Sequence, residues 1–147
     1  MALPRSNVHA IPCQISELAE YEQQISNLQG FDFVVLGMGD DGHVSSLFAN
    51  HKASFEQDRY AVKAVNVPNR QAPNRATITH KTIRLSDVIA ILVMGDSHKG
   101  LVYHDIMKKD GCKDVKKYSV CSVISNKKVT WFVDEHIADY SFMRDEL

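Results

Sequence analysis

The densest group of chemically useful side chains lies between Gly37 and His43, in the order Gly-Met-Gly-Asp-Asp-Gly-His. Histidine is the side chain best suited to proton transfer near neutral pH, and a nearby carboxylate such as Asp41 can fix its tautomer and increase its basicity. Glycines permit backbone conformations and close approaches that a Cβ atom would hinder. The glycines of this loop are Gly37, Gly39 and Gly42. The spacing therefore suits an acid/base pair on a glycine-rich loop.

The same segment also has a purely structural interpretation. In a glycine-rich turn between a strand and a helix, an aspartate can serve as the helix cap, and His43 would then be incidental. The spacing alone does not separate this interpretation from the catalytic one. A dinucleotide-binding GxGxxG fingerprint is disfavoured, because the histidine follows the third glycine at once and no second strand ends in an acid.

Two basic residues are candidate ligands for an anion. Arg75 lies ahead of Thr77 and Thr79, which share one face of an expected strand, and a guanidinium suits a bidentate contact with phosphate. Lys99 falls in the first turn of an expected helix, where an ammonium and a helix N-terminus could together hold an anion. Taken singly, each residue is more often a solvated surface charge.

Histidine and cysteine spacings give little support to a metal site. The six histidines other than His43 show neither HxxxH nor HExxH spacing. The three cysteines include no CxxC pair and predict no disulfide framework, which favours a reducing compartment. Cys121 is expected to lie in the core as part of an apolar strand.

Helical and strand-like segments alternate along the chain. Helices are expected over residues 15–28, 97–109 and 134–140, with Ser16 and Asp134 as N-caps. Strands are expected over residues 31–37, 60–67, 76–79, 87–95, 120–124 and 129–133, the first of them buried on both faces. This alternation predicts a layered α/β fold with a mostly parallel sheet. Ligands of such sheets bind beyond the carboxyl ends of the strands, so the loops after 31–37 and 87–95 are the expected site.

The composition fits a single globular domain over residues 1–147. Of the 147 residues 44% are hydrophobic and 24% are charged, and the formal net charge of −1 gives no sign of a nucleic-acid surface or a membrane anchor. No apolar stretch is long enough to span a bilayer, and no signal peptide is recognisable. The last four residues, Arg144-Asp-Glu-Leu147, are close to an endoplasmic reticulum retention signal, which is read only in the lumen. We therefore expect a cytoplasmic protein, with the lumen as the alternative.

Residues 31–48, Phe-Asp-Phe-Val-Val-Leu-Gly-Met-Gly-Asp-Asp-Gly-His-Val-Ser-Ser-Leu-Phe, resemble the GxGxDGHxASLF signature of the 6-phosphogluconolactonase family. Further stretches agree with the family in the same order, namely residues 3–11, 74–79, 93–99 and 129–134. The resemblance thus covers nearly the whole chain. Glucosamine-6-phosphate deaminases of the same superfamily carry a glutamate five residues after the histidine, where this chain has Phe48. That departure favours the lactonase branch.

The resemblance implies a fold, a reaction and a role for each candidate residue. The fold would be a modified Rossmann type, and the reaction would be hydrolysis of 6-phosphogluconolactone to 6-phosphogluconate in the pentose phosphate pathway, without an organic cofactor. His43 would match the general base that activates water, and Asp41 would orient it. Arg75 and Lys99 would match the groups that bind the substrate's phosphate.

The chain also departs from the family pattern. It lacks the phosphate loop resembling Ser-Gly-Gly-Ser-Thr-Pro and the Asp-Glu-Arg motif that precede the shared segments in family members. We therefore expect the C-terminal portion of the family's domain, without its first strands. Such a chain would expose a sheet edge, through which it would associate with itself or with a missing N-terminal half. The alternatives to a lactonase are a non-catalytic module that binds sugar phosphates or a protein partner, and an amino-sugar-phosphate deaminase or isomerase.

Overall fold

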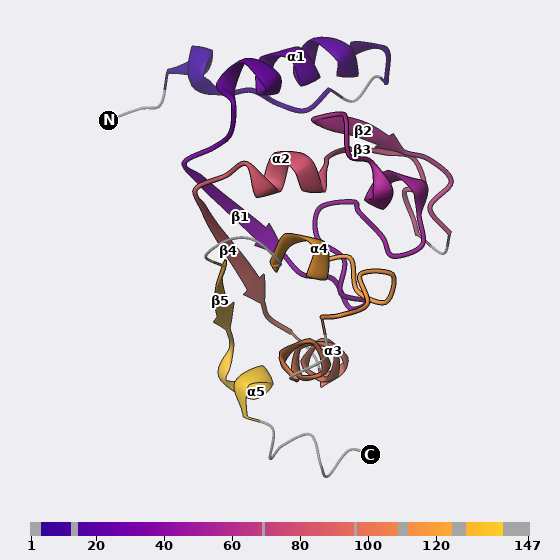
Figure 1. The fold of residues 1–147 in the computed structure, drawn as a ribbon, viewed down its shortest axis with the longest axis vertical. Coiled ribbons are helices and arrows are strands. Elements are labelled where there is room, and N and C mark those ends of the chain that lie inside the picture. The colour runs from indigo at the N-terminus through magenta and orange to yellow at the C-terminus, as the bar shows by residue number, and fades with distance from the viewer. Residues whose placement is uncertain are drawn as a thin grey trace.

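The structure is a computed structural model, and it describes residues 4–12, 15–68, 70–95, 97–108, 112–124 and 129–139. Its larger sheet consists of three parallel strands in the order β1-β4-β5 (Figure 1). They are β1 (Phe33–Gly37), β4 (Val88–Val93) and β5 (Val129–Val133). Because all three strands run in one direction, their carboxyl ends meet at one edge of the sheet. The parallel sheet and the mixture of helices and strands confirm the predicted fold class.

A second, smaller sheet is antiparallel and contains β2 (Ala61–Ala64) and β3 (Arg75–Ile78). Both strands fall largely within segments predicted from the sequence, but they pair with each other and not with the parallel strands. Residues 65–74 join them, and the backbone N–H of Val67 donates to the carbonyl of Pro73 at 2.9 Å across this loop.

Helices follow or precede each strand of the parallel sheet (Figure 1). They are α1 (Leu18–Leu28), α2 (His80–Arg84), α3 (Ser97–Met107), α4 (Cys121–Ile124) and α5 (Glu135–Ala138), with short 3-10 segments η1 (Arg5–Asn7), η2 (Ile15–Glu17) and η3 (Lys52–Phe55). Asp134 caps α5 as predicted, since its carboxylate accepts the N–H of Ile137 at 2.9 Å. The predicted cap at Ser16 is wrong, because Ser16 lies inside η2. No helix in the described ranges has the length and apolar character that crossing a membrane would need.

The strand predicted over residues 120–124 is wrong, because the chain there forms α4. The N–H groups of Cys121, Ser122 and Val123 bond to carbonyls three residues earlier, at 3.1, 3.0 and 2.9 Å. Val120 and Val123 are fully buried. A short apolar run with this spacing fits one face of a helical turn as well as it fits a strand, so periodicity alone could not decide between them.

Cys112 and Cys121 form a disulfide, with their Cα atoms 5.1 Å apart. The expectation of no disulfide is therefore wrong for this pair. The bridged segment packs on the loop that follows β1, since the N–H of Val120 donates to the carbonyl of Gly42 at 3.1 Å.

The two faces of the parallel sheet differ in burial. One face forms the core, and its buried side chains are Val34, Leu36, Ile89, Ile91 and Val93. On the other face Phe33, Val35 and Phe132 are 56%, 53% and 54% exposed. The prediction that residues 31–37 are buried on both faces is thus wrong for this structure, because no element among the described residues covers the second face.

Candidate active site

The loop after β1 turns back on itself at the carboxyl edge of the sheet. The N–H of Met38 donates to the carbonyl of Leu92 at 3.0 Å, which continues the pairing of β1 with β4. The N–H of Gly39 then donates to the carbonyl of His43 at 2.8 Å, and the N–H of Gly42 donates to the carbonyl of Gly39 at 3.1 Å. This tight turn brings His43 alongside Gly39.

Two of the three loop glycines are required by close approaches. A Cβ atom on Gly39 would lie 2.1 Å from Cε1 of His43, so a side chain there would displace the imidazole. Gly42 has a φ of +74°, and a Cβ atom there would lie 2.7 Å from the ring of Tyr118. Gly37 differs, because its Cβ position has no atom within 4 Å. The expected steric role is therefore present at Gly39 and Gly42 and wrong at Gly37.

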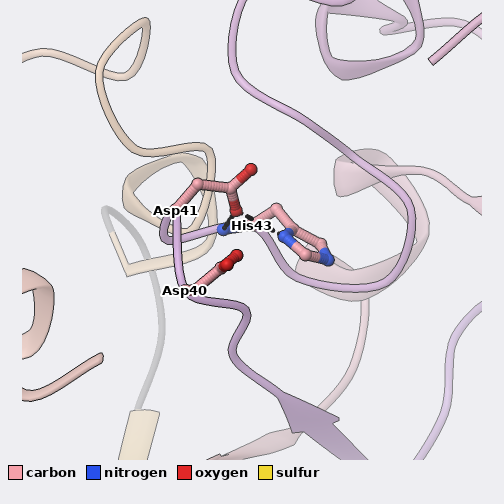
Figure 2. A group of neighbouring side chains, drawn as sticks. All are labelled: Asp40, Asp41 and His43. Carbon is pink, nitrogen blue, oxygen red and sulfur yellow. Dashed lines mark hydrogen bonds and ion pairs between the residues drawn. The ribbon is translucent and has the colours of Figure 1, made fainter. Parts of the chain in front are cut away.

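Asp41 and His43 lie side by side on this turn (Figure 2). The Nδ1 atom of His43 is 2.5 Å from Oδ1 of Asp41, and the backbone N–H of His43 donates to the same oxygen at 3.1 Å. Because an ionised carboxylate only accepts hydrogen bonds, Nδ1 carries the proton and Nε2 is left as the basic nitrogen.

The surroundings of Asp41 keep its carboxylate ionised. Partial burial alone would raise the pKa of Asp41, but the side-chain and backbone hydrogen bonds from His43, together with the charges of His43 and Arg70, outweigh it and lower the pKa to about 2. A negative charge beside Nδ1 stabilises the imidazolium that forms when Nε2 accepts a proton. The contacts between Asp41 and His43 suit an acid/base pair, and their catalytic role stays a prediction.

The ring of Phe48, only 5% exposed, is a platform shared by several of these groups. The imidazole of His43 packs on it with ring centroids 4.2 Å apart. The guanidinium carbons of Arg70 and Arg75 lie 4.9 and 5.4 Å from its centroid. The structure thus brings Arg75 and His43, both predicted from the sequence, to the same side chain.

Arg70 is a site residue that sequence reasoning missed. Its Nη2 donates to Oδ2 of Asp41 at 2.6 Å and lies 3.6 Å from Oδ1 of Asp40. Arg70 lies in the loop between β2 and β3, and no motif around it marks a function. Its place over Phe48 depends on how that hairpin packs, which no local sequence pattern encodes.

Lys99 lies in the first turn of α3, which begins beyond the carboxyl end of β4. Its Nζ donates to the carbonyl of Met94 at 3.2 Å. The N–H groups of Gly95 and Ile137 lower the pKa of Asp134, with smaller contributions from the charges of His136 and Lys99. Lys99 therefore lies near the carboxyl ends of β4 and β5, whereas Arg75 lies over the ring of Phe48.

Two other segments support the loop from behind. The N–H of Ser46 donates to Oγ1 of Thr77 at 3.1 Å, which ties the loop to β3. The hydroxyl of Ser119 donates to the carbonyl of Leu47. The hydroxyl of Tyr118, whose ring lies against Gly42, donates to Oδ2 of Asp105 at 2.8 Å.

A pocket of about 490 Å³ adjoins this cluster, and its lining includes Asp40, Asp41, Phe48, His51 and Arg70. A slightly larger pocket of about 530 Å³ lies between α1 and β2, away from the acid/base pair. We associate function with the first pocket, because it adjoins polar groups that converge on one point.

Asp40, Asp41 and His43 offer three potential ligand atoms within 4.8 Å of one another. Both oxygens of Asp41 already accept hydrogen bonds, one from His43 and the other from Arg70. A cation here would have to compete with a guanidinium for the same carboxylate. The contacts therefore fit an oriented acid/base pair better than a metal centre.

Comparison with known proteins connects these features to a family. A family model described as glucosamine-6-phosphate isomerases/6-phosphogluconolactonase matches residues 1–131. The chain is 30% identical over 150 residues to a protein named 6-phosphogluconolactonase 3, chloroplastic, from Arabidopsis thaliana. This alignment covers 90% of this chain and 44% of that protein. The chain is 30% identical over 112 residues to a probable 6-phosphogluconolactonase 4, chloroplastic, from Oryza sativa subsp. indica. That alignment covers 76% of this chain and 34% of the relative.

A solved structure of 6-phosphogluconolactonase from Trypanosoma cruzi superposes with a TM-score of 0.69 at 25% sequence identity, covering 92% of this chain and 56% of that one. The chain thus spans 34% to 44% of the length of the two plant relatives. The family model matches far more than half of the 147 residues, including the loop that carries Asp41 and His43. The chain therefore belongs to the glucosamine-6-phosphate isomerase/6-phosphogluconolactonase family.

Proposed function

We propose that this chain provides the acid/base half of a 6-phosphogluconolactonase site, which hydrolyses 6-phosphogluconolactone to 6-phosphogluconate in the pentose phosphate pathway. The observation that carries the proposal is the Asp41–His43 pair, with its Nδ1–Oδ1 distance of 2.5 Å at the carboxyl edge of a parallel sheet. The relatives named as 6-phosphogluconolactonases support the choice of substrate.

In this mechanism Nε2 of His43 takes a proton from water while the water oxygen bonds to the lactone carbonyl carbon. The carbonyl electron pair moves onto the carbonyl oxygen and forms a tetrahedral intermediate. When this intermediate collapses, the bond to the ring oxygen breaks and His43 returns the proton to that oxygen. The acid product then ionises to 6-phosphogluconate, and Asp41 holds the tautomer throughout.

The phosphate of the substrate is assigned to Arg75 and Lys99. Arg75 is near the pair through Phe48, and its Nε donates to the carbonyl of Ala72 at 2.8 Å, which steadies its stem. Lys99 lies in the first turn of α3, the helix that follows β4. These two cations, one from β3 and one from α3, would hold one end of an anionic substrate and leave its lactone ring at His43.

Phe48 supports a lactonase over a deaminase of amino-sugar phosphates. At its position the resemblance gives deaminases a glutamate, and here an aromatic ring packs on the imidazole with centroids 4.2 Å apart. A buried apolar ring cannot supply a second carboxylate to a proton relay. The deaminase or isomerase alternative therefore lacks one of its expected groups.

We further propose that residues 1–147 are a single domain, equivalent to the C-terminal part of a lactonase domain. The uncovered sheet face with Phe33, Val35 and Phe132 supports a polypeptide partner. That partner would be a second copy or a segment equivalent to the part of the longer relatives outside this match. A non-catalytic sugar-phosphate module is the second candidate function.

The location of the chain is proposed as cytoplasmic on its sequence, but the Cys112–Cys121 disulfide favours an oxidising compartment such as the endoplasmic reticulum lumen. Non-reducing peptide mapping of the protein isolated under alkylating conditions separates the two. A quantitatively bridged pair would exclude a permanently reduced protein.

The activity itself is tested by lactone hydrolysis, measured against the spontaneous rate, for the wild type and His43→Ala. Loss of a general base is expected to lower the rate about 10²- to 10⁴-fold. A chemical-shift titration with 6-phosphogluconate accompanies the assay. Binding without hydrolysis supports the non-catalytic module, whereas full activity in His43→Ala would exclude His43 as the base.

A further inference from the structure

We propose that Arg70 is a positioning residue, which holds the Asp41 carboxylate so that His43 presents Nε2 in a single tautomer. The inference rests on the proposed acid/base role of His43. It concerns a residue outside every motif that carries the family resemblance.

The two oxygens of the Asp41 carboxylate have different partners. Oδ1 of Asp41 faces Nδ1 of His43 at 2.5 Å, and Oδ2 accepts from Nη2 of Arg70 at 2.6 Å. Because Arg70 holds one oxygen, rotation of the Asp41 carboxylate about the Cβ–Cγ bond would break a charge-assisted hydrogen bond. The other oxygen therefore remains directed at the imidazole.

Arg70 is itself held in place by an aromatic ring. Its guanidinium carbon lies 4.9 Å from the centroid of Phe48, the ring that also supports the imidazole of His43. The arginine side chain is 27% exposed, less than the 44% of Asp41. One aromatic ring thus sets the positions of the base and of the residue that orients its carboxylate.

The charges around Arg70 favour a positioning role over substrate binding. Arg70 lies within 4.0 Å of carboxylate oxygens on both Asp40 and Asp41, so its single positive charge is offset by two negative ones. A cation in that environment attracts a phosphate weakly. Arg70 therefore acts on Asp41, and the phosphate is left to Arg75 and Lys99.

The test compares Arg70→Met, Arg70→Lys and the wild type in the 147-residue chain. Methionine keeps an apolar stem over Phe48 but has no donor, and lysine restores a cation. Arg59→Met is the matched control, since it removes a guanidinium paired with Glu22 outside the site. Nitrogen NMR of the His43 ring reports the tautomer, and lactone kinetics report kcat and KM.

We expect one tautomer, with a bare Nε2, in the wild type and the Arg59→Met control. Arg70→Met is expected to show a mixture of tautomers and a kcat lowered about ten- to a hundredfold, with KM changed less than about twofold. Arg70→Lys is expected to recover much of both.

A single unchanged tautomer in folded Arg70→Met would overturn the proposal, and so would a rise in KM at constant kcat. If Arg70→Met does not fold, Arg70→Lys decides: wild-type tautomer and kcat support positioning, and wild-type kcat with a raised KM overturns it. If no protein hydrolyses the lactone, the proposed function fails for this chain, and the tautomer measurement still decides the role of Arg70.

Discussion

The rings of His43 and Phe48 pack with their centroids 4.2 Å apart and their planes inclined by 37°. This contact restricts rotation of the imidazole, so its Nδ1 remains next to Asp41. Phe48 is therefore more than an apolar replacement for a carboxylate. It fixes the plane of the imidazole, and Gly39 leaves room for that ring because it has no Cβ atom.

Gly39→Ala is expected to abolish or strongly reduce hydrolysis, because the new Cβ would lie 2.1 Å from Cε1 of His43 and force the ring off Phe48. Gly37→Ala is the matched control, since no atom lies within 4 Å of its Cβ position. Both variants are compared by thermal melting, by the ring resonances of His43 and by lactone hydrolysis. Equal effects of the two substitutions on the His43 resonances would contradict the role given to Gly39.

The sequence predicted the parts of this site that are local and missed the parts that depend on packing. The loop from Gly37 to His43 carries its glycines, aspartates and histidine within seven residues. Its possible chemistry could therefore be predicted without knowing its geometry. Arg70 reaches the same carboxylate from the far side of Phe48, which requires the β2–β3 hairpin to be placed first. The same limit applies to α4, where a short buried run fits a helical turn or a strand equally well.

The uncovered sheet face was also beyond local prediction. Val35 and its neighbours in β1 are apolar on both sides of the strand, a pattern that indicates a doubly covered strand. The pattern is correct about the residues, but the described elements cover only the side that carries Val34 and Leu36. The pattern of one strand does not specify what covers its other side.

Arg75→Ala and Lys99→Ala are each expected to weaken binding of 6-phosphogluconate about ten- to a hundredfold, the usual effect of losing a charge-assisted contact. Binding of unphosphorylated gluconate is expected to change little, because the proposed contacts are to the phosphate. Calorimetry with both ligands checks this difference. If both ligands lose affinity equally, the two residues support structure and not phosphate recognition.

Asp41→Asn is expected to alter the pH dependence of stability in one direction. The folded pKa of Asp41 is lowered to about 2 from an ordinary value of 3.8, so its stabilising contribution is present above about pH 4 and is lost as the pH falls toward 2. The difference in unfolding free energy between the wild type and Asp41→Asn should therefore shrink over that interval.

Denaturant unfolding at several pH values measures this difference. Asp105 also titrates in acid, because hydrogen bonds from Lys117, Tyr118 and Lys108 lower its pKa, but it is common to both proteins and cancels. A difference that grows on acidification would contradict the ionised pair.

The parallel sheet leaves one apolar face uncovered by the described elements. Phe132 is 54% exposed on β5, and β1 is an edge strand of the same sheet. Apolar surface next to an unpaired strand edge favours association with other chains. We expect the 147-residue chain alone to be larger than a monomer by light scattering, or only marginally stable. Phe132→Lys is expected to reduce the mass, whereas Leu28→Lys, on α1 and 60% exposed, should leave it unchanged. A wild-type monomer that melts cooperatively would show that this face needs no partner.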